Sequence, residues 1–185
     1  MAYPNILISG LPKSGKSTLI KELQKIYQVP VMGIGDILRA RWKEQFPNGE
    51  LPFETYWPNL PFESQVKINQ DLKERIAQGE IIGDTRYPII VENEKSFKLF
   101  VTASLETRVE RVYNNPENTL SKSGIRKILL AREQDELKLG KQLTHDQDYD
   151  YRDPKHCHLY LRTDRLTVEE EVGLVLAGFT FWIHT

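Results

Sequence analysis

Residues 10–17, Gly-Leu-Pro-Lys-Ser-Gly-Lys-Ser, decide the fold because they match the pattern G-x-x-x-x-G-K-[ST]. The apolar run Ile-Leu-Ile at 6–8 comes shortly before them, and Leu19, Leu23 and Ile26 follow at helical spacing. A short apolar run followed by a glycine is typical of a strand buried on both faces of a parallel sheet. The octapeptide therefore lies between a predicted strand and a predicted helix, which is the context that its pattern requires.

The chemistry of this pattern is the binding of phosphate by backbone N–H groups. Gly10 and Gly15 allow a tight backbone path whose N–H groups point inward toward phosphate oxygens, helped by the N-terminus of the following helix. Lys16 supplies a mobile positive charge to the β- and γ-phosphates, and the Ser17 hydroxyl is a ligand for Mg²⁺. Lys13 either contacts phosphate or is solvated. We therefore expect ATP and Mg²⁺ here, and the predicted nucleotide-binding residues of the loop are Gly10, Lys13, Ser14, Gly15, Lys16, Ser17 and Thr18.

Strand-like and helix-like segments alternate along the whole chain. This alternation predicts an α/β protein in which a parallel sheet is covered by helices on both faces. The predicted strands are 6–8, 29–32, 81–82, 97–101 and 158–162. The predicted helices are 15–27, 36–47, 61–78, one from 104, 125–139 ending at Gly140, and one from 167 ending near Gly178. Asp36 is expected to cap the second of these helices, and 47–61 and 141–156 are expected to be loops.

The composition of the chain excludes several classes of protein. The 185 residues include 25 Lys+Arg and 26 Asp+Glu, so bulk electrostatics does not favour nucleic acid as a partner. No stretch approaches the roughly 20 apolar residues that cross a bilayer, and the N-terminus shows no leader pattern. Cys157 is the single cysteine, which excludes an internal disulfide. We expect one domain over residues 1–185, in the cytoplasm, with no nucleic-acid or membrane partner and with a monomer favoured.

Charged residues follow two further strands, at the edge where open α/β sheets bind ligands. Asp84 comes directly after an apolar run, and in proteins with this loop such an aspartate often holds Mg²⁺, although it is also a common turn residue. Arg86 lies two residues beyond Asp84, and Arg39 lies three residues beyond Asp36. Guanidinium groups suit a dianionic phosphate. We therefore expect Arg39 and Arg86 to bind a second anion, and Ser17 with Asp84 to bind the metal.

Two later helices also carry arginines. Arg108 and Arg111 are three residues apart on the helix from 104, and Arg132 lies on the next helix, four residues before Glu136. Two interpretations stay open for this charged surface. It is a solvated face with pairs such as Arg132 with Glu136, or a subset of its basic residues closes over the phosphates and neutralises charge in the transition state.

Together these residues resemble the nucleoside monophosphate kinase family, and more closely its cytidylate-kinase-like members, over most of the chain. Residues 35–39, Gly-Asp-Ile-Leu-Arg, are similar to the family's Gly-Asp-x-Leu-Arg segment, whose arginine contacts the acceptor phosphate. Residues 84–86, Asp-Thr-Arg, lie where the family has its second acceptor-phosphate arginine. Residues 108–111 resemble the Arg-x-x-Arg helix whose later arginine packs on the donor adenine. Residues 132–133 resemble the Arg-Glu pair of the lid helix, whose arginine reaches the transferring phosphate.

The resemblance implies a three-layer P-loop kinase fold with a five-stranded parallel sheet, an acceptor-binding insertion at about 35–80 and a lid at about 114–145. It implies that Arg111 binds the nucleotide. The catalytic residues that it implies are Lys16, Asp84, Arg86 and Arg132, and the acceptor-binding residues are Asp36, Arg39 and Arg86. Two departures stand out. No arginine occurs at 114–115, and Lys138 or Lys141 takes the place of a second lid arginine, without its bidentate fork.

The predicted reaction is transfer of the γ-phosphate of ATP to a nucleoside monophosphate such as CMP or dCMP. Such an acceptor needs no general base, because a phosphate monoester with a second pKa of about 6 is mostly ionised at pH 7. One alternative is a kinase that acts on a hydroxyl of a nucleoside or small metabolite, with Asp36 as the base. Another is a protein that binds ATP without turnover. The sequence lacks Asn-Lys-x-Asp, which argues against a GTPase switch.

Overall fold

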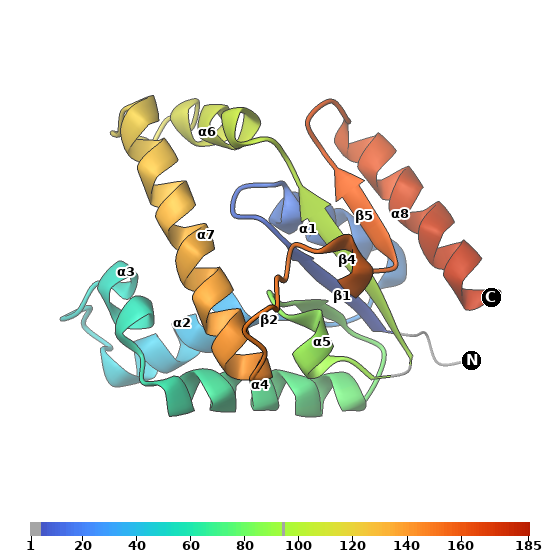
Figure 1. The fold of residues 1–185 in the computed structure, drawn as a ribbon, viewed down its shortest axis with the longest axis horizontal. Coiled ribbons are helices and arrows are strands. Elements are labelled where there is room, and N and C mark those ends of the chain that lie inside the picture. Colours follow the sequence, from blue (N-terminus) through green and yellow to red (C-terminus); the bar gives the residue numbers. More distant parts are fainter. Residues whose placement is uncertain (1–4, 94) are drawn as a thin grey trace.

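The computed structural model describes residues 5–93 and 95–185, which form a five-stranded parallel sheet with helices on both faces (Figure 1). The strand order is β2-β3-β1-β4-β5, so β1 lies in the centre. The strands are β1 Asn5–Gly10, β2 Val31–Gly33, β3 Ile82–Asp84, β4 Ser96–Thr102 and β5 Leu159–Arg162. The predicted α/β class and the five predicted strands are confirmed, with small shifts at the strand ends. The predicted single domain also includes residues 1–4 and 94, which lie outside the described residues.

The helices are more numerous than the sequence pattern predicts, and α7 and α8 extend beyond their predicted ends. The α-helices are α1 Lys16–Tyr27, α2 Ile34–Gln45, α3 Phe53–Tyr56, α4 Phe62–Ala77, α5 Pro88–Val91, α6 Leu105–Tyr113, α7 Lys122–Thr144 and α8 Val168–Ile183. Two short 3₁₀ helices are η1 Trp57–Asn59 and η2 Pro154–His156. Among the described residues, no helix combines the length and the hydropathy that crossing a membrane requires.

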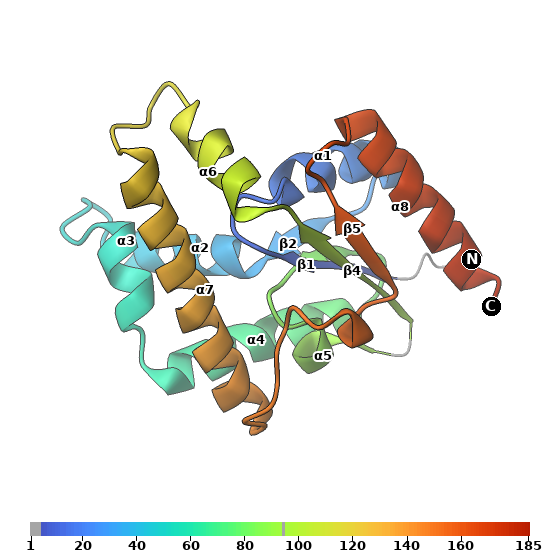
Figure 2. The same ribbon diagram turned by 45° about the horizontal axis from the view of Figure 1, so that its top comes forward.

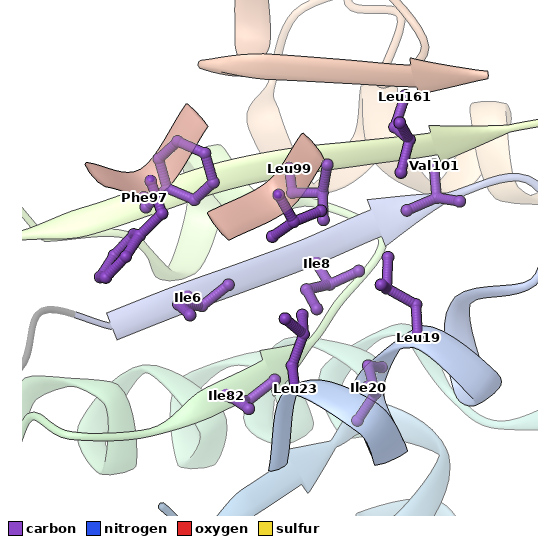
Figure 3. Packing of buried hydrophobic residues seen from close by; sticks show 12 residues of the cluster. Ile6, Ile8, Leu19, Ile20, Leu23, Ile82, Phe97, Leu99, Val101 and Leu161 are labelled. Atoms are coloured by element: carbon purple, nitrogen blue, oxygen red, sulfur yellow. The ribbon is translucent and has the colours of Figure 1, made fainter. Parts of the chain in front are cut away.

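The central strand divides its side chains between two helical layers, because successive side chains point to opposite faces. Ile6 and Ile8 are buried against α1 and α8, together with Leu19 and Leu23 of α1 (Figure 3). The opposite face is buried against α4 and α5 through Leu7, which packs in one cluster with residues of both helices. The three-layer α/β/α architecture predicted for the chain is therefore confirmed.

The register of the sheet brings the predicted functional residues to one edge. Gly10 at the end of β1 pairs with Val101 of β4, and Gly33 at the end of β2 pairs with Asp84 at the end of β3. Because all five strands are parallel, the residues that follow these ends lie on the same side of the sheet. The loop from 10 to 17 and the segments after Gly33 and Asp84 therefore meet there.

The predicted helix ends at Gly140 and Gly178 are wrong. Helix α7 runs through Gly140 to Thr144, because the absent side chain lets Tyr87 and Tyr149 pack against the helix, where a Cβ would lie 2.9 Å from Tyr87 Cε1. The predicted loop 141–156 therefore begins inside a helix. Helix α8 likewise continues past Gly178 to Ile183, with Gly178 packed over the Leu159 side chain.

The segment 47–61, predicted as a loop, contains α3 and η1. Aromatic packing orders it: the Trp42 and Phe53 rings have centroids 5.9 Å apart, and those of Phe46 and Tyr56 are 5.8 Å apart. Asp36 does not cap α2, since that helix begins at Ile34 after Gly33 and so includes Asp36 in its first turn. Predictions from local pattern failed where tertiary contacts decide the backbone.

Helices α2, α3, α6 and α7 lie to one side of the sheet, where the two insertions were predicted, and α4 runs from that side under the sheet (Figure 1). Figures 1 and 2 both show α7 passing alongside α3. A direct contact joins them, because the Arg132 guanidinium of α7 lies 5.7 Å from the centre of the Trp57 ring, which follows α3. The extents of the acceptor-binding insertion and of the lid stay predictions.

Candidate active site

The loop between β1 and α1 has the backbone that its glycines predict. Gly10 has a φ of 146° and Gly15 a φ of 103°, values that side-chain-bearing residues rarely adopt. Gly10 is further constrained by β4, because a Cβ there would lie 1.9 Å from the Val101 carbonyl oxygen. Lys13 also has a positive φ, of 63°. The loop therefore turns tightly over the end of the sheet and enters α1 directly after Gly15.

Lys16 lies across the mouth of this loop and is 8% exposed. Its ammonium group donates to the carbonyl oxygens of Gly10 and Leu11, at 2.9 and 3.0 Å. Burial, together with the positive charge of Arg86, lowers the pKa of Lys16 from 10.5 to about 7. A phosphate at the loop would offer this ammonium group a stronger partner than two carbonyl groups.

The predicted catalytic residues meet around Lys16. Asp84 and Arg86, which follow β3, act electrostatically on its ammonium group, and so do Arg132 and Glu136 of α7. The three basic residues thus face two carboxylates, an excess of positive charge that suits a bound phosphate chain. The structure brings these residues together as predicted. The catalytic roles that the sequence assigns to them stay predictions.

Glu136 is the centre of this cluster. Its side chain is 5% exposed, and its carboxylate pairs with the guanidinium of Arg86 and accepts from Arg132 Nε at 2.8 Å. The Tyr151 hydroxyl donates to the second carboxylate oxygen at 3.1 Å, while the Tyr87 hydroxyl donates to the backbone carbonyl of Glu136 at 2.6 Å. Although burial disfavours the charge on Arg86, Glu136 raises its pKa. The pair of Arg132 with Glu136 is thus formed, with a buried carboxylate and a guanidinium side chain that is 38% exposed.

Asp36 and Arg39 lie beside this cluster, on α2. Their side chains pair at 3.4 Å and are both more than half exposed. An added Cβ on Gly33 would lie 3.2 Å from Asp36 Oδ2 and 3.1 Å from the Asp84 Cβ, so the two aspartates are neighbours at the ends of β2 and β3. Arg39 also lies 5.8 Å from the centre of the Phe53 ring. An exposed arginine weakly paired here is available to a second anion.

A cavity of about 430 Å³ opens beside the loop and α1. Its lining includes the predicted nucleotide-binding residues at 13 and 15–18, together with Arg111, Leu166, Val168 and Glu171. Arg111 is held in place by the Thr163 backbone carbonyl at 3.0 Å and hydroxyl at 3.1 Å. The Thr163 hydroxyl in turn donates to the Ser14 carbonyl at 2.8 Å. The lining thus combines residues of the phosphate-binding loop with the apolar side chains of Leu166 and Val168, a combination that suits a nucleotide.

The residues predicted to bind Mg²⁺ fit that ion. Ser17 lines the cavity directly after Lys16, and Asp84 lies close enough to act on the Lys16 charge. The described residues contain no group of three His, Cys, Asp or Glu side chains that would hold a metal alone. Mg²⁺ is commonly bound through one or two protein oxygens, with phosphates and water completing its coordination. One hydroxyl and one carboxylate are therefore a suitable donor set.

The phosphate-binding loop also contains a polar group without a partner. The Ser14 hydroxyl is buried and makes no hydrogen bond among the described residues, so it is free to bond to a ligand in the loop.

Arg108 has a structural place instead of a ligand-binding one. It is 3% exposed and donates to Glu133 of α7 at 2.7 Å and to the Pro12 carbonyl at 3.4 Å. Arg108 thus connects the phosphate-binding loop to the middle of α7. Two residues of the site were not predicted from the sequence, namely Thr163, which holds Arg111 in place, and Glu171, which lines the cavity. The one sequence signal for Glu171 is its spacing of three residues from Val168, which places the two residues on the same helix face.

Comparison with known proteins decides the family. A family model described as an AAA domain matches residues 9–136, which is more than half of the chain. This chain belongs to that family. The matched region of this AAA domain protein includes the phosphate-binding loop, Asp84, Arg86, Arg132 and Glu136.

Curated relatives of this AAA domain protein include two archaeal enzymes. A cytidylate kinase of Methanospirillum hungatei is 24% identical over 165 residues, which cover 89% of this chain and 90% of the relative. A cytidylate kinase of Pyrobaculum aerophilum is 27% identical over 175 residues, which cover 92% of this chain and 90% of the relative. The predicted resemblance to cytidylate kinases is confirmed at this modest identity.

Solved structures share the fold at low identity. An uncharacterized protein from Eubacterium ventriosum has a TM-score of 0.70 at 11% identity, covering 96% of this chain and 98% of its own. A gluconokinase from Sinorhizobium meliloti has a TM-score of 0.59 at 14% identity, covering 98% and 95%. A shikimate kinase from Bacteroides thetaiotaomicron has a TM-score of 0.56 at 14% identity, covering 94% and 97%. The predicted P-loop kinase fold is confirmed. The predicted enzyme class, an ATP-dependent phosphotransferase, is confirmed by the family model together with the cytidylate kinases.

Proposed function

We propose that this protein transfers the γ-phosphate of ATP to the phosphate group of a nucleoside monophosphate, with CMP or dCMP as the foremost acceptors. One observation carries the proposal: Lys16, Arg86 and Arg132 gather at the end of the sheet around a single buried carboxylate, Glu136. Such an excess of positive charge suits two phosphate groups brought together. The similarity of nearly the whole chain to two cytidylate kinases supports the choice of acceptor.

The donor nucleotide binds with its phosphates in the loop and its nucleoside in the adjoining cavity. The backbone N–H groups of 10–17 contact the phosphate oxygens, and Lys16 leaves the carbonyl groups of Gly10 and Leu11 to contact the β- and γ-phosphates. Arg111 lies beside the base. Bound Mg²⁺, held by Ser17 and Asp84, would neutralise charge on the phosphates.

The acceptor phosphate binds between Arg39 and Arg86. Two guanidinium groups position one of its oxygens in line with the γ-phosphate, and this proximity supplies much of the rate. The acceptor is ionised at pH 7, so no side chain needs to remove a proton. Arg132 contacts the transferring group and stabilises the charge that develops on its oxygens.

A second function has a specific observation in its favour. The Asp36 carboxylate is exposed beside Asp84, where it would accept the proton of a hydroxyl acceptor. Proteins of the same fold include enzymes named for shikimate and gluconate, both of which carry hydroxyl groups. A third candidate, ATP binding without turnover, rests on the lysines at 138 and 141 and on the absence of an arginine at 114–115.

ADP production across a panel of acceptors separates these functions. The panel contains CMP, dCMP, UMP and AMP, the matching nucleosides, and hydroxyl-bearing acids such as shikimate and gluconate. The proposal predicts turnover with one or more monophosphates and background rates with the nucleosides and acids. Turnover with hydroxyl acceptors alone would replace it with the second function. ATP binding with no turnover on any acceptor would replace it with the third.

Several further expectations stay predictions. A small-molecule substrate, as kinases of this class use, is part of the proposal. The expectation that nucleic acid is not a partner rests on the near-neutral net charge. The cytoplasmic location and the monomeric state also stay predictions.

A further inference from the structure

Glu171 is a buried carboxylate that faces the donor cavity without a partner. It lies in the first turn of α8, is 4% exposed and lines the cavity beside the phosphate-binding loop. Within residues 5–93 and 95–185, no hydrogen bond or ion pair reaches its carboxylate oxygens. Although the residue is buried as a whole, its carboxylate oxygens are not closed off inside the protein, because Glu171 lines the cavity and these oxygens are not among the buried unpartnered atoms. A ligand in the cavity can therefore supply the hydrogen-bond donors that the described residues do not.

A positive side chain, Arg111, lies close to Glu171 without donating to its carboxylate. An added Cβ on Gly15 would lie 3.9 Å from each carboxylate oxygen and 3.7 Å from Arg111 Nη1. Arg111 is therefore close, yet its guanidinium donates to Thr163 and to the Lys13 carbonyl instead of to Glu171. Burial raises the pKa of Glu171, and the charge of Arg111 opposes that rise. The carboxylate thus lines the cavity beside Arg111 without accepting a hydrogen bond from it.

We propose that Glu171 determines nucleotide specificity by accepting hydrogen bonds from N–H or O–H groups on the nucleoside part of the donor. The proposal rests on the proposed function, since it requires that ATP occupy this cavity. A carboxylate repels phosphate groups, so its ligand must be the uncharged part of the nucleotide. Val168, three residues earlier on α8, and Leu166 line the same cavity and provide apolar surface for the flat face of the base.

The nucleoside of ATP offers two sources of such donors. The ribose has 2′- and 3′-hydroxyl groups, and adenine has an exocyclic amino group. A carboxylate accepts from either kind of donor, and bonds to an ionised acceptor are stronger than those between neutral groups. A site built to bond a donor rejects an analogue that lacks it, because the buried polar group is then left unpaired.

Titration calorimetry without an acceptor tests the proposal through binding alone. The ligands are ATP, 2′-deoxy-ATP, 3′-deoxy-ATP and purine riboside triphosphate, which lacks the amino group, each with Mg²⁺. The wild-type protein should bind at least one analogue tenfold or more weakly than ATP. A loss with a deoxy analogue identifies the ribose as the source, and a loss with purine riboside triphosphate identifies the base.

Three variants complete the experiment. Glu171→Ala should bind ATP and the discriminated analogue within threefold of each other, while Glu171→Gln, which keeps one oxygen acceptor, should retain part of the discrimination. Glu169→Gln, an exposed neighbour on α8, should behave as wild type. Equal affinity of the wild-type protein for all four nucleotides would overturn the proposal, as would an equal loss for all four in Glu171→Ala. Failure of the wild-type protein to bind ATP at all would instead overturn the proposed function.

Discussion

The guanidinium of Arg86 pairs with the carboxylate of Glu136, so the segment after β3 is joined to helix α7 at the mouth of the phosphate-binding loop. The same carboxylate accepts from Arg132, at 2.8 Å. One buried residue of the predicted lid thus orients an arginine predicted to bind the acceptor and one predicted to act on the transferring group. The position of α7 and the arrangement of these two arginines are therefore coupled.

Replacing Glu136 with glutamine should lower stability substantially. The change removes the carboxylate that pairs with Arg86, at a site where Glu136 is almost fully buried, and breaking such a pair from one side costs about 3 kcal/mol. Chemical denaturation measures this loss. The matched control is Glu110→Gln, whose exposed pair with Lys122 should contribute less than about 1 kcal/mol. If the two variants lost similar, small amounts of unfolding free energy, Glu136 would not be the residue that holds Arg86 and Arg132 together.

Lys16→Met should abolish ATP binding yet make the free protein more stable. The folded protein holds the pKa of Lys16 at about 7 and the unfolded chain holds it at 10.5, so folding penalises its charge. This penalty is fully present below pH 7 and diminishes as the pH rises, because the unfolded chain then binds the extra proton. At pH 7 the variant should gain roughly 1–3 kcal/mol of unfolding free energy. Lys21→Met, an exposed position on α1, should leave both properties unchanged.

ATP affinity should fall as the pH rises above 7.5. In the free protein Lys16 loses its proton near pH 7, whereas bound phosphate favours the charged form and raises its pKa. Binding above pH 7.5 therefore takes up a proton, and the affinity should decrease by up to about tenfold per pH unit toward pH 9. Calorimetry in buffers of different ionisation enthalpy counts the protons taken up. A constant affinity with no proton uptake over this range would contradict the assigned role of Lys16.

Arg39→Ala should weaken acceptor binding selectively. Loss of a charge-assisted hydrogen bond to the acceptor phosphate should raise the KM for CMP by about tenfold or more. The KM for ATP should change by less than about twofold, since Arg39 lies on the acceptor side of the cluster. Steady-state kinetics with each substrate varied in turn measures both values. Lys43→Ala, an exposed residue of the same helix, is the control, and an unchanged KM for CMP would remove Arg39 from the acceptor site.

Asp36→Asn distinguishes a phosphate acceptor from a hydroxyl acceptor. If the acceptor is a phosphate, no base is needed, and kcat with CMP should fall by less than about tenfold. If Asp36 removes a hydroxyl proton, the loss should be on the order of 10²–10⁴. The kcat of the variant on the best acceptor measures the difference, and a loss in the larger range would favour the hydroxyl-acceptor function.

The phosphate-binding loop and the strands could be predicted because their determinants are local. The glycines at 10 and 15, the lysine at 16 and the apolar run at 6–8 lie within one short stretch of sequence. Parallel strands then force Gly33 and Asp84 to the same edge, so the neighbourhood of Asp36, Asp84 and Arg86 follows from topology alone.

The remaining features depend on contacts between distant segments. Gly140 looks like a helix end in the sequence, but Tyr87 and Tyr149 pack against it and α7 continues. Glu136 looks like one member of a surface pair, and its burial appears only once α7 is packed against the segment after β3. Glu171 is the last of three consecutive glutamates, and local pattern does not distinguish the one that faces the cavity.

Transfer of the γ-phosphate from ATP to CMP can be followed with a radioactive label. The protein is incubated with Mg²⁺, CMP and ATP labelled with ³²P at the γ-position, and the nucleotides are separated by chromatography. The label should appear in CDP as ATP is consumed, and Lys16→Met should form no labelled CDP. Label that remains in ATP with CMP and every other nucleoside monophosphate, while calorimetry shows ATP bound, would contradict the proposed function.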